Sequence, residues 1–226
     1  MAKILEVIVT SEDEAIEAER GGADRLELVR AFGLGGLTPE TELVERVLRR
    51  VSIPVRVMVR ETATLQAGGS AEIENLGRRA AELAQLPVDG LVLGFAREDK
   101  LDVAAAAALL AFAPDSKVTF HRAFDEAADP LLAIEQLKSQ PQIDRILTSG
   151  GAGNWQQRRE RLNAWQSAAG HIKLLVGAGL CSCTLAGLRV ESRLEEVHVG
   201  RAARIPQTIG GKVRREQVAA VKSALE

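Results

Sequence analysis

The amino-acid sequence predicts a single (β/α)8 barrel formed by residues 1–226, and three observations support this fold class. Apolar, strand-like runs alternate with helix-like segments along the whole chain, with no change of composition that would divide it into domains. Strands that alternate with helices are typical of parallel sheets, because a parallel neighbour needs a long connection. Eight such pairs, beginning with a strand and ending with a helix, match a closed barrel. A doubly wound open sheet is the alternative.

The predicted strands are short apolar runs, and several are apolar throughout, as expected for strands covered on both faces. They span residues 3–9, 24–29, 54–60, 89–95, 117–122, 144–150, 172–179 and 194–200. The first helix has Glu12 and Asp13 near its start and glycine at its end, as helix termini prefer. Before the second helix, Thr38 is a candidate N-cap with Pro39 at the first helical position.

A repeat with a spacing of two strand–helix units supports the barrel. The runs GGADRLEL, LPVDGLVL, PQIDRILT and SRLEEVHV each place an acidic residue just ahead of an apolar strand. A generic turn before a strand also favours aspartate, so such turns are the alternative explanation.

Composition and charge restrict the class of protein. The chain is 46% hydrophobic and 27% charged, as in ordinary globular proteins. A net charge of −2 lacks the basic character of nucleic-acid-binding proteins. No apolar run has the roughly 18 residues of a membrane span, and the start of the chain has no signal-peptide pattern. We therefore expect a cytoplasmic protein with neither nucleic acid nor membrane as partner.

Polar residues recur where the predicted strands end, which is where barrels carry their functional groups. Carboxylates, imidazoles and guanidinium groups around one mouth can bind an anion, transfer protons or hold a metal. We expect catalytic roles for Glu6, Glu27 and His121. Substrate-binding roles are expected for Arg60, Arg122, Ser149 and His198. The alternative is that each glutamate forms a salt bridge with a core arginine such as Arg60 or Arg122.

Glycine-rich turns follow the seventh and eighth strands, in the loops that commonly bind phosphate in barrels. Gly177, Gly179 and Gly200 are therefore further substrate-binding candidates, with simple tight turns as the alternative. After the fifth strand, Asp125 is expected to cap a helix or to pair with Arg122.

The chain has two cysteines, Cys181 and Cys183, in the segment LCSC. Two residues apart, they are poorly placed for a disulfide, and the cytoplasm would keep them reduced. Thiolates suit Cu(I) or zinc, so these cysteines are candidate metal ligands, with further ligands from His121 or His198.

Six runs in order, GGADRLEL, GGLTPE, TFHRAFD, ILTSGG, VGAGL and LEEVHVG, resemble the CutC family of copper homeostasis proteins. The resemblance implies a cytoplasmic TIM-type barrel, often a homodimer, with a role in copper handling. The polar mouth that it implies corresponds to Glu6, Glu27, Arg60, His121, Arg122, Asp125, Ser149 and His198.

Two departures from the family pattern concern the site. Cysteines proposed as copper ligands in the family are replaced here by Ile8, Val9 and Val29. The family's Arg-Pro-Arg segment after the third strand is reduced to Arg60, and the loop 61–70 differs from the family pattern.

Three functions are compatible with these features. The first is a CutC-type copper homeostasis protein whose mouth binds a ligand, with copper itself implied only by the resemblance. The second is a lyase, isomerase or hydrolase that acts by acid–base chemistry on a small anionic or carbohydrate-like molecule. The third is a binding barrel without catalysis. The fold class cannot decide among them, because barrels host many chemistries.

Overall fold

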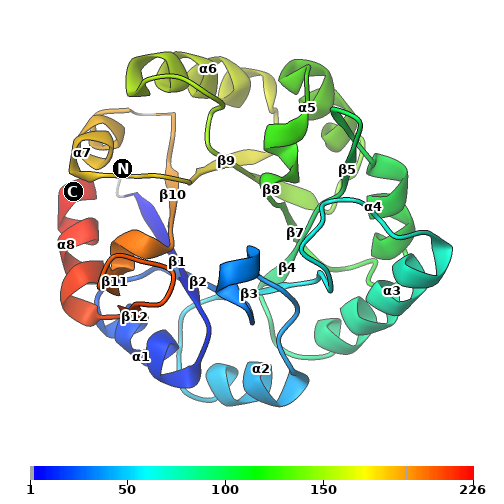
Figure 1. Ribbon diagram of the computed structural model, residues 1–226, viewed down its shortest axis with the longest axis horizontal. Helices are drawn as coiled ribbons and strands as arrows, with labels where there is room; N and C mark the ends of the chain where they lie inside the picture. Colours follow the sequence, from blue (N-terminus) through cyan, green and yellow to red (C-terminus); the bar gives the residue numbers. More distant parts are fainter. Residues whose placement is uncertain (1–2, 192) are drawn as a thin grey trace.

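The computed structural model describes residues 3–191 and 193–226, with only the backbone of Ser182 and Cys183. Eight parallel strands within these residues close into a barrel, which confirms the predicted (β/α)8 fold (Figure 1). Seven of these strands lie within the predicted ranges, and the sixth along the chain begins one residue before its range, at Ile143. The barrel strands are β1 (Ile4–Val9), β2 (Arg25–Leu28), β3 (Val55–Met58), β4 (Gly90–Leu93), β7 (Val118–Phe120), β8 (Ile143–Thr148), β9 (Lys173–Val176) and β10 (Glu196–Val199).

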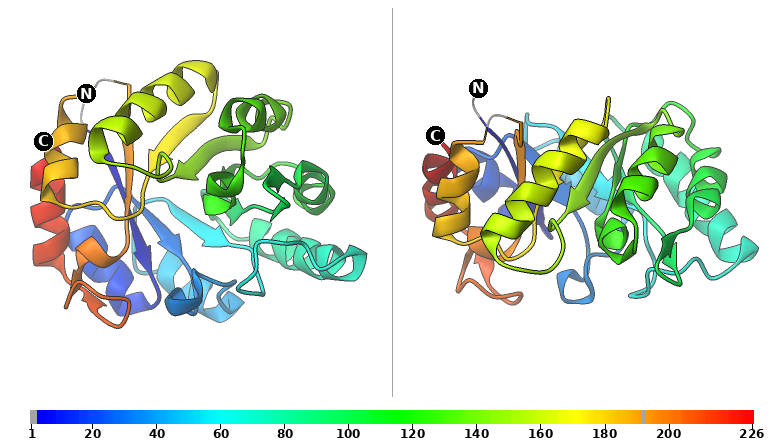
Figure 2. Two further views of the ribbon diagram at one scale, coloured as in Figure 1. Left: turned by 45° about the horizontal axis from the view of Figure 1, so that its top comes forward. Right: turned by 90° about the horizontal axis from the view of Figure 1, so that it is seen from above.

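Helices surround the barrel on its outer side, as the views of Figures 1 and 2 show. Most of the buried apolar side chains form one continuous core cluster to which both strands and helices contribute. The surrounding helices are α1 (Glu12–Arg20), α2 (Thr41–Leu48), α3 (Ser70–Ala84), α4 (Val103–Leu110), α5 (Pro130–Lys138), α6 (Trp155–Ala168), α7 (Ser182–Arg189) and α8 (Arg215–Leu225). Among the described residues, none of these helices is long and apolar enough to cross a bilayer.

Local sequence signals explain where several helices begin. Ser11 caps α1 by accepting from the backbone of Glu14. Asp129 caps α5 directly before Pro130, and Asn154 forms a capping box at the start of α6. Such side-chain acceptors satisfy backbone N–H groups that have no partner within the first helical turn.

The expected cap at Thr38 is wrong, because α2 begins at Thr41 and Glu40 is its N-cap residue. The Thr38 hydroxyl instead donates to the carbonyl of Arg60 at 3.0 Å and accepts from its N–H at 2.8 Å. Thr38 therefore ties the loop after β2 to the end of β3, next to the barrel mouth.

Short elements with no clear signal in the sequence shape the loops above the strands. The first is a 3-10 turn, η1 (Phe32–Leu34). A second turn, η2 (Arg122–Glu126), follows β7, and a third, η3 (Arg201–Ala203), follows β10. Two small hairpins complete the set, β5 (Ala96–Arg97) with β6 (Lys100–Leu101), and β11 (Arg204–Ile205) with β12 (Lys212–Val213).

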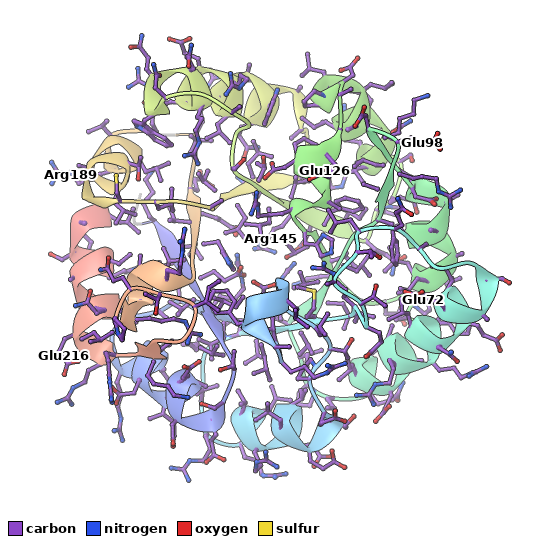
Figure 3. The ribbon with its side chains drawn as sticks, viewed as in Figure 1. Glu72, Glu98, Glu126, Arg145, Arg189 and Glu216 are labelled. Carbon is purple, nitrogen blue, oxygen red and sulfur yellow. The ribbon has the colours of Figure 1, made fainter. Side chains whose placement is uncertain are left out.

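Charged side chains fill the interior of the barrel towards the amino ends of its strands. Arg56 donates to Asp89 at 2.8 Å and to both carboxylate oxygens of Asp144 at 2.7 Å. Arg145 pairs with Asp144 and Glu196, and Figure 3 shows it near the centre of the barrel. The linked ion pairs, which we call the lower network, comprise Glu6, Arg25, Arg56, Asp89, Asp144, Arg145 and Glu196.

Ion pairs and hydrogen bonds of the repeated acidic residues explain the sequence repeat, and two of these residues belong to the lower network. Asp89 and Asp144 are repeat residues whose partner is Arg56 inside the barrel. The fourth run places Glu195 at the same position, where it pairs with Lys173 at 2.9 Å. Asp24 accepts from the backbone of Leu5 at 2.7 Å and from Lys222 at 2.6 Å. The repeated acidic residues thus join strands and helices, which is more than the generic turn role that was the alternative.

Candidate functional site

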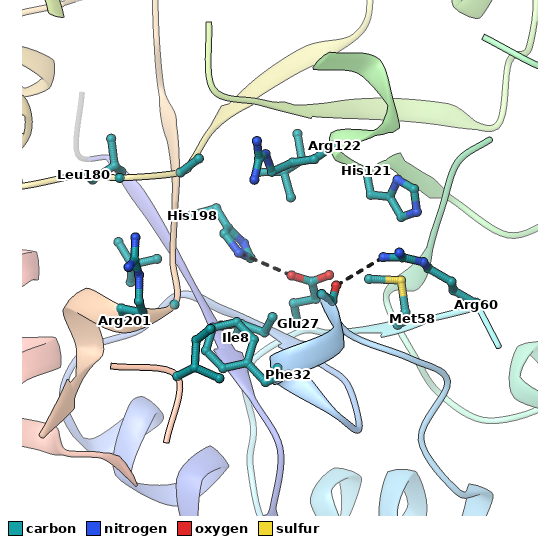
Figure 4. Close-up of a pocket in the computed structure, with 18 of the residues that line it drawn as sticks. Ile8, Glu27, Phe32, Met58, Arg60, His121, Arg122, Leu180, His198 and Arg201 are labelled. Carbon is teal, nitrogen blue, oxygen red and sulfur yellow. Dashed lines mark hydrogen bonds and ion pairs between the residues drawn. The ribbon is translucent and has the colours of Figure 1, made fainter. Parts of the chain in front are cut away.

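A cavity of about 530 Å³ opens at the carboxyl ends of the barrel strands (Figure 4). Its apolar lining includes Ile8, Phe32, Met58 and Leu147. The cavity therefore combines apolar walls with a few charged groups, which is typical of small-molecule sites. Of the residues proposed from the sequence, it brings together Glu27, Arg60, His121, Arg122, Gly179, His198 and Gly200.

The remaining candidates do not line this cavity. Glu6 lies within β1, buried and in contact with His198 and Arg25. The Ser149 hydroxyl accepts from the backbone of Gly151 at 3.1 Å, a contact within its own loop. A side chain at Gly177 would meet Leu147 at 2.8 Å, so this glycine permits close packing behind the cavity wall.

The two cysteines are not gathered with the histidines at the mouth. Cys181 is exposed at the N-cap position of α7, where its N–H donates to the Thr184 hydroxyl at 2.8 Å. The side chain of Cys183 is outside the part of the chain that the structure describes. Among the described residues, Cys181 is absent from the group of side chains that could jointly hold a metal.

His198 connects two buried glutamates below the cavity. Its Nδ1 lies 2.8 Å from Glu6 Oε1, and its Nε2 lies 3.4 Å from Glu27 Oε2. The fold explains this contact, because β1 lies between β10 and β2 and the three side chains share the barrel interior. Glu6 and His198 are also direct partners in the β1–β10 register. Figure 4 shows the contact between His198 and Glu27.

The cation that balances Glu6 was not identified from the sequence. Arg60 and Arg122 were the suggested partners, but Arg25 on the neighbouring strand forms the ion pair with Glu6. Arg25 also donates to Glu196 at 2.6 Å. The repeated Asp-Arg step before an apolar strand, in DRLEL and DRILT, is the signal that could have indicated buried arginines at these positions.

The two glutamates have opposite shifts in acidity. Burial opposes the ionisation of Glu6, but Arg25 and the hydrogen bond from His198 outweigh it and lower the pKa of Glu6. Glu27 has no such arginine partner, so burial raises its pKa to about 7, against the attraction of His198. Burial also disfavours the charged form of His198, yet Glu27 and Glu6 together raise the pKa of its imidazole.

Glu6, His198 and Glu27 form a chain of contacts along which a proton can pass. Ionised Glu6 accepts from His198 Nδ1, which leaves Nε2 of the neutral ring directed at Glu27. Glu27 retains its proton up to about neutral pH. The arrangement resembles the general logic in which a buried carboxylate fixes the tautomer of a histidine that handles a proton.

His121 is held differently. Its Nδ1 accepts from the backbone N–H of Ala123 at 3.1 Å, so a neutral ring carries its proton on Nε2. That Nε2 is buried without a hydrogen-bond partner among the described residues. Burial and the nearby charge of Arg60 lower the pKa of His121 to about 3. Near neutral pH, His121 is therefore a fixed hydrogen-bond donor.

Asp125 organises the loop that follows His121. Its carboxylate accepts from Arg122 Nε at 3.0 Å, which confirms the expected pairing. It also accepts from the Thr148 hydroxyl at 2.6 Å and the Ser149 N–H at 3.1 Å. The other expected role, as an N-cap, is wrong, because His121 caps the η2 turn and Asp125 lies within it.

A second buried ion pair supports the opposite side of the mouth and was not found from the sequence. Arg204 donates to both carboxylate oxygens of Glu14, at 2.7 and 3.0 Å, and to the carbonyl of Gly211 at 2.7 Å. Its guanidinium carbon lies 4.7 Å from the centre of the Phe32 ring, which lines the cavity. Arg204 therefore holds the β11–β12 hairpin and η1 in place.

The fold and the cavity define a (β/α)8-barrel protein with a buried acid–base cluster at its mouth. Comparisons with known proteins identify its family: residues 3–203 match the CutC family. A Homo sapiens protein named "Copper homeostasis protein cutC homolog" is 35% identical over 96% of this chain and 79% of its own length. A "family protein CutC" of Xanthomonas axonopodis pv. citri is 32% identical over 98% and 97%. The chain belongs to the CutC family.

A solved structure agrees with the fold. The putative copper homeostasis protein CutC from Streptococcus agalactiae superimposes with a TM-score of 0.78 over 88% of this chain and 98% of its own. The sequence identity between the two is 23%, so this comparison supports the barrel architecture alone.

Proposed function

We propose that this protein serves copper homeostasis, the role stated in the name of its Homo sapiens relative, and that it acts through the cavity at its barrel mouth. The chemistry of the cavity favours a small organic anion as the ligand, on which the protein moves a proton. The observation that carries this proposal is the buried pair of Glu27 and His198 beside a cavity lined by three arginines. A cytoplasmic homodimer, as the resemblance implies, is part of the proposal.

The roles of the residues follow from their surroundings. Glu27, with a pKa of about 7, can accept or donate a proton near physiological pH, which is the condition for efficient acid–base catalysis. His198 relays the proton, and Glu6 holds its ring in the required orientation. His121 would donate its Nε2 proton in a hydrogen bond to a carbonyl or hydroxyl oxygen of the ligand, as neutral histidines do in other proton-transfer enzymes.

Isotope exchange tests this proposal. Candidate organic acids and sugar phosphates are first screened by thermal shift, since a ligand that binds only the folded state raises its apparent stability. A compound that binds is then incubated with the protein in D2O and followed by proton NMR. The wild type is expected to exchange a carbon-bound hydrogen for deuterium. Glu27→Gln should bind the compound but lose the exchange. Equal exchange in both proteins would contradict the assigned role of Glu27.

A copper ion is the second candidate ligand, because Glu6, Glu27 and His198 place one ligand atom each within 4.8 Å of one another. Carboxylate and imidazole donors suit Cu(II) better than Cu(I), which prefers sulfur. This donor set fits a metal only in part. Glu6 already forms an ion pair with Arg25, and Glu27 would have to lose its proton to bind a metal ion. No step of the proton transfer above depends on copper.

Titration with Cu(II) and with Cu(I) decides between the two ligands. Binding of Cu(II) that His198→Asn abolishes and Cys181→Ser leaves unchanged would support a metal site at the relay. Binding that depends on Cys181 would place copper outside the mouth. Absence of binding would leave the organic anion as the remaining candidate.

A further inference from the structure

The three arginines that line the mouth cavity differ in how their charges are balanced. Arg122 forms an ion pair with Asp125. The guanidinium of Arg60 donates only to backbone carbonyls, those of Thr62, Ala63 and Gly35. Arg201 has no side-chain hydrogen bond or ion pair with the described part of the chain. Neither Arg60 nor Arg201 has a carboxylate partner there, so both charges are available to a ligand.

These two unbalanced charges lie on opposite sides of the cavity. Figure 4 shows Arg60 and Arg201 at either side, with His198 and Glu27 between them. The topology requires this separation: Arg201 follows β10 and Arg60 follows β3, and in the barrel wall β1 and β2 lie between these two strands. Glu27 belongs to β2, one of the intervening strands.

The cavity also has an excess of positive charge. Its carboxyl groups are Glu27 and Glu126. Glu27 is buried in contact with His198, and Glu126 lies at the end of the η2 turn that carries Arg122. Three arginines therefore line the cavity against two carboxyl groups, in a chain whose net charge is −2. Beside apolar walls, charges interact more strongly than in water.

We propose that the ligand of this site carries two anionic groups, one at each end, and spans the cavity from Arg60 to Arg201 with its central atoms beside Glu27 and His198. Short dicarboxylates and sugar bisphosphates share this chemistry. The inference rests on the proposed function and names its substrate class. Fixing both ends of a small molecule also fixes the position of its centre, which is what proton transfer to a chosen carbon requires.

Isothermal titration calorimetry with matched pairs of compounds tests the proposal. Each pair differs by one terminal anionic group: glutarate and pentanoate, adipate and hexanoate, fructose 1,6-bisphosphate and fructose 6-phosphate. At least one doubly charged compound is expected to bind about tenfold or more tightly than its partner, since a hydrogen-bonded charge contact contributes at least this much. Comparing the carboxylate and phosphate pairs identifies the anionic group.

Arginine variants show which arginines bind the two anionic ends of the ligand. Arg60→Gln and Arg201→Gln should each reduce the affinity for the doubly charged compound to that of the singly charged one. Arg78→Gln is the matched control, because Arg78 lies on the exposed side of α3 and pairs with Glu74. This control should leave both affinities unchanged. Circular dichroism melting of each variant confirms that the barrel is folded.

The possible failures are distinguishable. Equal affinities within every pair, with binding lost only in Arg60→Gln, would overturn the two-ended ligand and leave an anion site at the mouth. If no compound binds the wild type, the two-ended ligand is overturned. The deuterium exchange experiment, run with any other compound that binds, then tests the proposed proton transfer independently of the two-ended ligand.

Discussion

Glu27 shows how the surroundings of one residue decide its chemistry. Glu6 and Glu27 are both glutamates in barrel strands with apolar neighbours in sequence. Glu6 has Arg25 as a direct ion-pair partner, whereas Glu27 has only His198 at 3.4 Å. One glutamate is therefore a permanent anion and the other a group that exchanges its proton near neutral pH. This difference follows from the cation within reach and not from the residue type.

The first prediction concerns the effect of Glu27 on stability. Its pKa is about 7 in the folded protein and near 4.5 in the unfolded chain. Between these values the folded state binds more protons, so stability falls as pH rises from 4.5 to 7, by on the order of 3 kcal/mol. Glu27→Gln, which cannot ionise, should lose less stability than the wild type over this range. Urea unfolding at pH 5 and pH 8 measures the difference. Parallel pH profiles would refute it.

The second prediction concerns His121, whose shift has the opposite consequence. Its pKa falls to about 3 on folding, so the unfolded chain binds the extra proton below pH 6.5. Stability due to this residue is present at pH 7 and is lost on acidification, by about 2–3 kcal/mol at pH 4.5. In His121→Asn, the asparagine can still accept from Ala123, and the loss should largely disappear.

His171→Asn is the control for this measurement, because His171 is exposed. Unfolding of the wild type and both variants in urea at pH 7 and pH 4.5 separates the effects. An equal loss of stability on acidification in wild type and His121→Asn would show that His121 is not buried in its neutral form.

At the scale of elements, the loops above the strands are held by single side chains that cross between them. Thr38 joins the loop after β2 to the end of β3. Asp125 joins η2 to the end of β8. Arg204 joins the β11–β12 hairpin to α1. Above the barrel strands, backbone pairing is confined to short hairpins and single bridges, so these side-chain cross-links contribute to the shape of the mouth.

The third prediction tests one of these cross-links. Asp125→Ala removes acceptors for Arg122, Thr148 and Ser149 and should destabilise the protein by about 2–3 kcal/mol, as expected for hydrogen bonds to a charged group. Hydrogen exchange should increase in segments 121–127 and 148–153. Asp129→Ala removes the N-cap of α5, so hydrogen exchange should increase in segment 130–138 instead. Identical exchange patterns in the two variants would contradict the cross-link.

At the scale of the whole molecule, the barrel has two polar regions with different purposes. In the lower network, each described arginine has a carboxylate partner, and Arg56 is fully buried. At the mouth, Arg60 and Arg201 have none among the described residues, and the cavity is open to solvent. In barrels, the amino end of the strands typically serves stability and the carboxyl end serves function. In this protein the arginines at the amino end are paired with carboxylates, whereas two arginines at the carboxyl end are not paired with a carboxylate among the described residues, in agreement with that division.

The fourth prediction compares the two regions. Arg56→Met leaves Asp89 and Asp144 without their buried cation and should destabilise the protein by about 3–5 kcal/mol. Arg60→Gln, at the mouth, should change stability by about 1 kcal/mol or less, because no carboxylate loses its partner. Urea denaturation of both variants at pH 7 provides the measurement. A cost below about 1 kcal/mol for Arg56→Met would show that the lower network does not stabilise the barrel.

The periodicity of the sequence predicted the fold because strand and helix patterns are local. Each barrel strand matches its predicted range to within one residue, and the alternation leaves few topologies for a parallel sheet. Residues at strand ends were also predictable: once eight strands close, Glu27, His121 and His198 must approach the same mouth. Loop details such as the cap at Thr38 were not predictable, because tertiary contacts overrode the local preference.

By itself, the sequence determined the barrel, the end of the barrel that carries the polar groups, and the identity of most of those groups. Only the tertiary structure decided which of the other charges are balanced: Arg25 rather than Arg60 or Arg122 for Glu6, and no carboxylate for Arg60 among the described residues. The physical reason is that a charge pair forms across strands far apart in the chain, over distances of about 3 Å that no local pattern specifies. Those pairings leave Glu27 able to hold a proton and two arginines able to hold a ligand.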